Sequence, residues 1–148
     1  MYDLQKASVW KRCSAALFDF IILTMVVVGI AAILSNLVGY DNYFNNMNAS
    51  YEKYEQQYGI KFDITEEEYL SKTEEEKALW QDAYQALTID QEAMYAYNMV
   101  FRLSVLIVTM SILFGYLILE FAIPLIFKNG QTLGKKIFGI GVMRTDGI

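Results

Sequence analysis

Two long apolar blocks, separated by a charged stretch, constrain this chain of 148 residues more than any other feature. The first block runs from Phe20 to Tyr40 without a charged residue, and as a helix it spans roughly 31 Å, the thickness of the hydrocarbon core of a bilayer. The second block runs from Leu103 to Phe127 and is interrupted only by Glu120. Each block is long enough for one crossing as a helix, so the sequence predicts an all-α membrane protein.

A cleaved signal peptide is the alternative interpretation of the first block, because Lys11 and Arg12 precede it as a basic n-region would. The apolar run is longer than the usual h-region of about 7–15 residues, its N-terminal extension carries Asp19, and no clear A-x-A site closes it. We therefore favour a retained membrane helix.

The distribution of charge predicts the orientation of the chain in the membrane. Residues 40–98 hold 13 acidic residues against four lysines. Seven of the eight basic residues outside that stretch lie toward the two ends of the chain: Lys6, Lys11 and Arg12 come before the first block, and Lys128, Lys135, Lys136 and Arg144 follow the second. The eighth, Arg102, immediately precedes the second block. By the positive-inside rule, both termini are expected in the cytoplasm and the acidic segment outside.

The acidic segment is patterned as helices and not as a plain loop. Thr65 and Thr73 each stand three residues before a glutamate, which is the spacing of a capping box, so a helix is expected to start at each. Gly59 is expected to end an earlier helix, and a further start near residues 88–90 could run without a breaker into the second block. The predicted order is a cytoplasmic N-terminus (1–12), a transmembrane helix (13–39), an acidic helical extracytoplasmic segment (40–98), a second transmembrane helix (99–127) and a short basic cytoplasmic tail (128–148).

Composition excludes several classes of function. The chain has no His and one Cys, so it cannot alone build a Cys/His zinc site or a Ser-His or Cys-His nucleophile pair. A net charge of −5 argues against a nucleic acid partner. We expect that the protein is not an enzyme and that it binds neither a metal ion nor a cofactor. We interpret the glutamates after Thr65 and Thr73 as helix caps and solvated surface charge. The alternative is that they form a cation site or a docking surface for a basic partner.

The ionisable residues inside the apolar blocks are the candidate functional residues. Arg12 and Asp19 lie on one helix face with two alanines between them, and Glu120 is expected at a depth similar to that of Asp19. Asp19 and Glu120 are therefore a candidate site for a proton or a small cation. The alternative is that Asp19 pairs with Arg12 or with another helix, and that Pro124 only kinks the second span. Cys13 is either a small packed residue, which we favour, or an acylation site.

The basic tail carries its own short motif of Gly130, Gln131, Thr132, Leu133, Gly134 and Lys135. Only three residues separate Gly130 from Gly134, and Lys136 stands where a P-loop needs Ser or Thr, so no nucleotide site is predicted. The tail is expected at the inner membrane surface, where Lys135 and Lys136 meet lipid head groups.

Arg12, Asp19, the second apolar block, the Gly130–Lys135 motif and a terminal Asp-Gly together resemble the RDD family of bacterial membrane proteins. The family is named for one arginine and two aspartates, which here are Arg12, Asp19 and Asp146. The resemblance implies a multi-pass protein of the bacterial cytoplasmic membrane with a role in transport.

Two functions are carried forward from the sequence. One is a component of a transport system for a small cation or a proton, acting through Asp19 and Glu120. The other is a non-enzymatic subunit or scaffold of a membrane complex that docks a partner through the acidic external helices. Two helices cannot enclose a path, so the expected partners besides the lipid bilayer are further copies of the chain or other membrane subunits.

Overall fold

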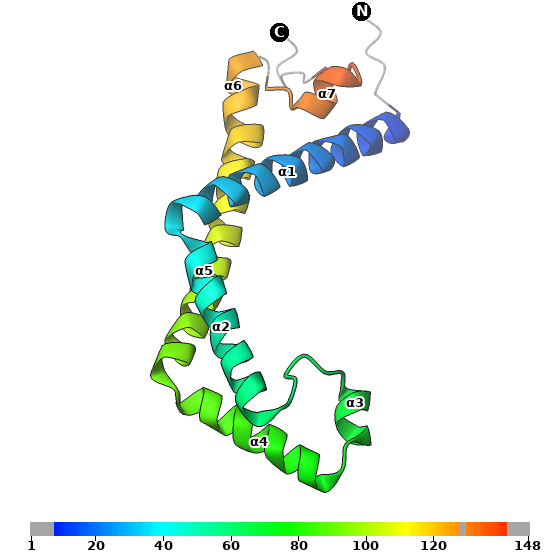
Figure 1. Ribbon diagram of the computed structural model, residues 1–148. Helices are drawn as coiled ribbons and strands as arrows, with labels where there is room; N and C mark the ends of the chain where they lie inside the picture. The colour runs from blue at the N-terminus through cyan, green and yellow to red at the C-terminus, as the bar shows by residue number, and fades with distance from the viewer. Residues whose placement is uncertain (1–7, 128–129, 142–148) are drawn as a thin grey trace, which may run out of the picture. The chain divides into compact units, whose positions relative to one another are not determined.

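A computed structural model describes residues 8–127 and 130–141 of the chain (Figure 1). The predicted Asp146 lies outside the described residues. Within the described residues the chain is helical and contains no strand. The elements in chain order are α1 (Val9–Val38), α2 (Tyr40–Tyr58), α3 (Glu66–Ser71), α4 (Glu74–Ile89), α5 (Gln91–Tyr116), a π-helical turn η1 (Leu117–Ala122), α6 (Ile123–Phe127) and α7 (Leu133–Ile137).

Two of these helices are long and apolar enough to cross a membrane. The first is α1, of 30 residues, and the second is the continuous run α5–η1–α6, of 37 residues from Gln91 to Phe127. Large apolar side chains are exposed along both, among them Phe20 and Met25 on α1 and Leu125 on α6. A helix that exposes such side chains is suited to lipid and not to water. The predicted all-α class with two membrane-type helices is confirmed.

The chain divides into two compact units. Unit 1 comprises Met1–Leu34 and Ile107–Ile148, and unit 2 comprises Ser35–Leu106. The long helices α1 and α5 each contribute to both units, while α2, α3 and α4 belong to unit 2 alone.

In unit 1 the C-terminal part of the second long helix carries a stripe of buried residues and approaches α1 closely at Gly115. Ile107, Ser111, Gly115 and Leu119 recur every fourth residue and are all buried. A Cβ atom added at Gly115 would lie 2.8 Å from Cγ2 of Val27, so the glycine permits a close approach of the two helices. The Ser111 hydroxyl is satisfied within its own helix, because it donates to the carbonyl of Ile107 at 2.6 Å.

Pro124 changes the helix that precedes it. Proline has no N–H to donate to the carbonyl of Glu120, and its ring crowds that carbonyl. The helix widens over Leu117–Ala122 into a π-helical turn, and the backbone N–H of Ile123 donates a hydrogen bond to the carbonyl of Ile118. The proline therefore acts through a local change of helical pitch.

Unit 2 has its own core between α2, α4 and the start of α5. Tyr54, Leu87 and Ala93 are buried together. The partly buried Tyr51, Tyr58, Phe62 and Ala86 pack around them. The three core residues come from three different helices, so the core joins α2 and α4 to the first turn of the second long helix.

The predicted helix starts and ends in unit 2 are confirmed. Thr65 and Thr73 each form a complete capping box, with Glu68 and Glu76 as the reciprocal partners. Gly59 ends α2 in the left-handed conformation, with φ of 65°. The helix predicted to start near residues 88–90 begins at Gln91 and continues through the apolar block.

Candidate functional site

The carboxylate of Asp19 binds the C-terminal tail. Its Oδ2 accepts the hydroxyl proton of Thr132 at 2.6 Å, and its Oδ1 accepts the backbone N–H of Gly134 at 2.6 Å. Both carboxylate oxygens are thus used in charge-assisted hydrogen bonds, each across more than a hundred residues of sequence. We call Asp19, Thr132 and Gly134 the tail clasp.

The local sequence of the tail shapes it for this carboxylate. Thr132 is extended, with φ of −73° and ψ of 166°, and its side chain also accepts from the backbone N–H of Lys135 at 3.4 Å to cap α7. One hydroxyl therefore both starts α7 and binds Asp19. Thr132 is only 7% exposed, so its hydroxyl needs these partners.

Only glycine fits at position 134, where the tail lies against α1. A Cβ atom there would collide with the carbonyl oxygen of Ala15 and would lie 2.9 Å from Cγ of Asp19. Ala15 is itself buried, with 2% of its surface exposed. Backbone therefore meets backbone at this point, and neither partner can yield as a flexible side chain would.

An aromatic contact extends the clasp along both elements. The rings of Phe18 on α1 and Phe138 after α7 meet edge to face, with centroids 6.3 Å apart. Lys136 places its ammonium 3.5 Å from the ring centroid of Phe127, at the end of α6. The tail thus contacts both long helices of unit 1.

The structure places the predicted site residues separately. Arg12 and Glu120 are both exposed, whereas Asp19 is half-buried. Among the described residues, the hydrogen bonds of the Asp19 carboxylate go to the tail, and no ion pair joins it to Arg12 or Glu120. Glu120 lies in the π-helical turn. A shared proton or cation site at Asp19 and Glu120 stays a prediction.

The other tail and N-terminal residues complete this region. Gln131 donates through Nε2 to the carbonyl of Ile140 at 3.1 Å, and Gly130 has a positive φ of 66°. Leu133 is half-buried and Lys135 is exposed. Cys13 is exposed, so the favoured interpretation of it as a packed residue is wrong. It lies two residues from the buried Ala15, which turns it to about the opposite side of α1.

Thr132 and Gly134 were not recognised from sequence as partners of Asp19. An ionised carboxylate in an apolar helix requires donors, and a hydroxyl followed by an unhindered backbone N–H supplies two. The signal was present as the Thr-Leu-Gly triplet at residues 132–134, but nothing in the sequence spacing connects it with α1.

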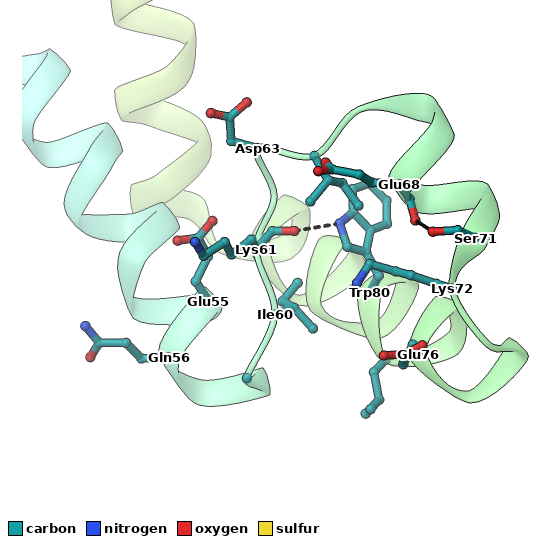
Figure 2. Close-up of a pocket in the computed structure, with 13 residues that line it drawn as sticks. Glu55, Gln56, Ile60, Lys61, Asp63, Glu68, Ser71, Lys72, Glu76 and Trp80 are labelled. Carbon is teal, nitrogen blue, oxygen red and sulfur yellow. Dashed lines mark hydrogen bonds between the residues drawn. The ribbon is translucent and has the colours of Figure 1, made fainter.

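Unit 2 contains an open pocket of about 900 Å³ bordered by α2, α3 and α4 (Figure 2). Trp80 of α4 lies among the lining side chains, and its indole N–H donates to the carbonyl of Lys61 at 3.2 Å. The Trp80 ring stacks on Tyr84, with planes 6° apart, and meets Phe62 and Tyr69 edge to face. The Trp80 side chain, which lines the pocket, is therefore held in position by three neighbouring rings and one hydrogen bond.

Four carboxylates and two ammonium groups also line this pocket, which we call the acidic pocket. The carboxylates are those of Glu55, Asp63, Glu68 and Glu76, and the ammonium groups are those of Lys61 and Lys72. Three of the carboxylates are fixed by backbone N–H groups: Glu55 by Phe62 at 2.7 Å, Glu68 by Thr65 at 2.9 Å and Glu76 by Thr73 at 2.9 Å. The pKa of Glu76 is lowered by its hydrogen bonds from Thr73. The pocket therefore presents carboxylates that are held in position by backbone hydrogen bonds.

Asp90 links the core of unit 2 to the start of α5. Its Oδ2 accepts from the Tyr54 hydroxyl at 2.9 Å, and its Oδ1 caps α5 by accepting from the N–H of Glu92 at 2.9 Å. Lys53 lies 3.5 Å away. The Tyr54 hydrogen bond, and then the backbone N–H of Ala93, lower the pKa of Asp90. Burial, and then the bond to Asp90, raise the pKa of Tyr54.

The described residues contain no group of three or more His, Cys, Asp and Glu side chains arranged to hold a metal ion. A search of curated proteins and a search of solved structures each find no match. The model of the RDD family, in contrast, matches residues 6–148, which is essentially the whole chain. The match includes both long apolar helices and the tail that Asp19 binds. The chain belongs to the RDD family and is a protein of membrane type.

Proposed function

We propose that the protein is a non-enzymatic subunit of a bacterial membrane complex, which docks a basic partner through unit 2 outside the cytoplasmic membrane. In this proposal α1 and the α5–η1–α6 run each cross the bilayer once, and both termini lie in the cytoplasm. The charge distribution supports that orientation, because residues 40–98 are strongly acidic and the basic residues flank the apolar blocks.

The observation that carries the proposal is the acidic pocket. Its carboxylates Glu55, Glu68 and Glu76 each use one oxygen to bind a backbone N–H. The second oxygen of each remains for a partner's cation, and the fixed rotamers mean that little side-chain entropy is lost on binding. Trp80 and the partly exposed Leu79 supply apolar surface beside the charges. A lysine or arginine side chain offers the matching combination of apolar stem and cationic head.

Purification in mild detergent followed by mass analysis of the intact assembly tests this proposal. We expect a partner in fixed stoichiometry that is lost when Asp63→Lys and Leu79→Glu are combined, since both residues line the pocket. Asp82→Lys is the matched control, because Asp82 is exposed on α4 but does not line the pocket. A partner that survives both the pocket variant and deletion of residues 45–90 would contradict the proposal, as would an assembly made only of this chain.

Transport of a proton or a small cation is a second candidate function, favoured by one specific observation. Glu120 lies within the π-helical turn, and such turns occur frequently at functional sites in helices. A transport path would require several copies of the chain or other membrane subunits. Ion flux into proteoliposomes is expected to fall in Glu120→Gln, which leaves the tail clasp intact. Equal flux in the wild type and this variant would defeat the transport hypothesis.

A further inference from the structure

The tail clasp sits at the edge of the hydrocarbon core and not in its middle. Asp19 immediately precedes the uncharged block from Phe20 to Tyr40, which alone fills roughly 31 Å. Trp10, near the start of α1, is 84% exposed, as suits an indole in the interface. The tail bound to Asp19 therefore lies at the level of the lipid head groups.

The clasp fixes which groups of the tail face outward. Asp19 binds the backbone of Gly134, and Phe138 packs on Phe18, so α7 is attached to α1 at two points. Lys135, Lys136 and Ile137 of α7 are all exposed, and the Lys136 ammonium also lies 3.5 Å from the ring centroid of Phe127. A short helix that presents two cations and an apolar side chain matches the boundary between head groups and acyl chains.

Arg12 lies on the face of α1 to which the tail binds. It precedes Ala15 by three residues and Asp19 by seven, so the three share one side of the helix. Arg12 is exposed, and no ion pair is formed by it among the described residues. A guanidinium is suited to bind a phosphate through two parallel hydrogen bonds.

The charge of this region is positive. The described part of unit 1 carries four cations, Lys11, Arg12, Lys135 and Lys136, against two carboxylates, Asp19 and Glu120. The Asp19 carboxylate is already bound by Thr132 and Gly134. The region is therefore complementary to an anionic surface.

We propose that Arg12, Lys135 and Lys136 form a binding site for an anionic phospholipid head group, and that Asp19 is the positioning residue that holds the two lysines beside Arg12. This inference does not depend on the docking partner of unit 2. It assigns different tasks to two residues of the family motif: Arg12 binds phosphate, and Asp19 binds the tail.

The full chain in nanodiscs that mix phosphatidylglycerol and phosphatidylcholine provides the test, with the lipids retained on the protein counted by native mass spectrometry. We expect preferential retention of phosphatidylglycerol, reduced about fivefold for each charge removed in Arg12→Gln and in the double variant Lys135→Gln, Lys136→Gln. The double variant Lys53→Gln, Lys77→Gln removes the same charge from unit 2, outside the acidic pocket, and is expected to change nothing. Unchanged retention in Arg12→Gln and in the tail double variant would overturn the proposal.

The variant Asp19→Ala distinguishes the effect of the tail clasp on lipid binding from the effect of charge alone. Removing a negative charge should by itself increase the binding of an anionic lipid, whereas release of the tail should decrease it. We expect a decrease, and an increase would overturn the positioning role. Glycerol 3-phosphate is added as a soluble competitor and is expected to leave the retained lipid unchanged. Displacement of the lipid by it would show a site for free phosphate esters and overturn the assignment to a membrane head group.

Discussion

The carboxylate of Asp19 accepts the backbone N–H of Gly134 at 2.6 Å, across 115 positions of the sequence. This bond, with that from Thr132, explains how a carboxylate next to an apolar block is accommodated, although no cation in the described part of the chain forms an ion pair with it. It also joins the first and last described helices of unit 1 at one point.

Replacing Gly134 by alanine should weaken the attachment of the tail. The added Cβ would overlap the carbonyl oxygen of Ala15, and backbone cannot move aside cheaply, so we expect a loss of at least about 1–3 kcal/mol of stability. The measurement is the thermal unfolding midpoint of the detergent-solubilised protein. Gly29→Ala is the control, because a Cβ there meets nothing within 4 Å. An unchanged midpoint in Gly134→Ala would show that the clasp does not support the fold.

The Thr132 hydroxyl should stabilise the folded protein through its hydrogen bond and not through the volume that it fills. Thr132→Val keeps the shape of the side chain but leaves Asp19 with one donor fewer, and a hydrogen bond to a charged group is worth about 1.5–3 kcal/mol. Thr132→Ser keeps the hydroxyl and should retain most of this stability. Urea unfolding of the three proteins in the same detergent gives the comparison. Equal losses for valine and serine would indicate that packing, not the hydrogen bond, is what matters.

Gly115 should behave differently from Gly134, because its nearest neighbour is a side chain. A Cβ at Gly115 would lie 2.8 Å from Cγ2 of Val27, so Gly115→Ala is expected to cost about 1–3 kcal/mol. Combining it with Val27→Ala should recover part of that loss, which a double-mutant cycle measures as a coupling energy. Strictly additive effects would mean that the two helices do not meet at these residues.

Acid should destabilise unit 2 through Asp90. Hydrogen bonds from Tyr54 and Ala93 lower its pKa in the folded protein below the ordinary value that it has when unfolded. The stabilisation is therefore fully present above that ordinary value and is lost as the pH falls through the folded-state pKa. Fluorescence of Trp80 in a Trp10→Phe background, followed during heating at a series of acidic pH values, reports on unit 2. Asp90→Asn should flatten this pH dependence, whereas Asp82→Asn should not.

The sequence predicted the helices well because their signals are local. The uncharged block at Phe20–Tyr40 and the capping boxes at Thr65 and Thr73 each depend on residues close together in the chain. The predicted environment of Asp19 considered helix partners only, since a spacing of seven residues suggested Arg12 and a similar depth suggested Glu120. The actual donors belong to the tail, and a contact across more than a hundred residues leaves no periodic trace. The π-helical turn at Leu117–Ala122 was likewise anticipated only as a kink at Pro124.

The acidic pocket, too, could not be predicted from the sequence. The sequence pattern predicts that glutamates following Thr65 and Thr73 cap helices, and Glu68 and Glu76 do so. Their convergence with Glu55 and Trp80 on one pocket depends on how α2, α3 and α4 pack, which is set by the core around Tyr54 and Leu87. Helix capping and a surface for a basic partner are therefore compatible roles of the same side chains.

Cross-linking in native membranes tests most directly whether Asp19 binds the tail. In a Cys13→Ser background, cysteines replacing Phe18 and Phe138 should be joined by a short bifunctional maleimide, because the two rings lie in contact. Phe20→Cys paired with the same Phe138→Cys is the control and should react far less, since residue 20 faces about the opposite side of α1. We predict that Asp19→Ala abolishes the cross-link between positions 18 and 138. An equal yield with aspartate and alanine at position 19 would contradict the account.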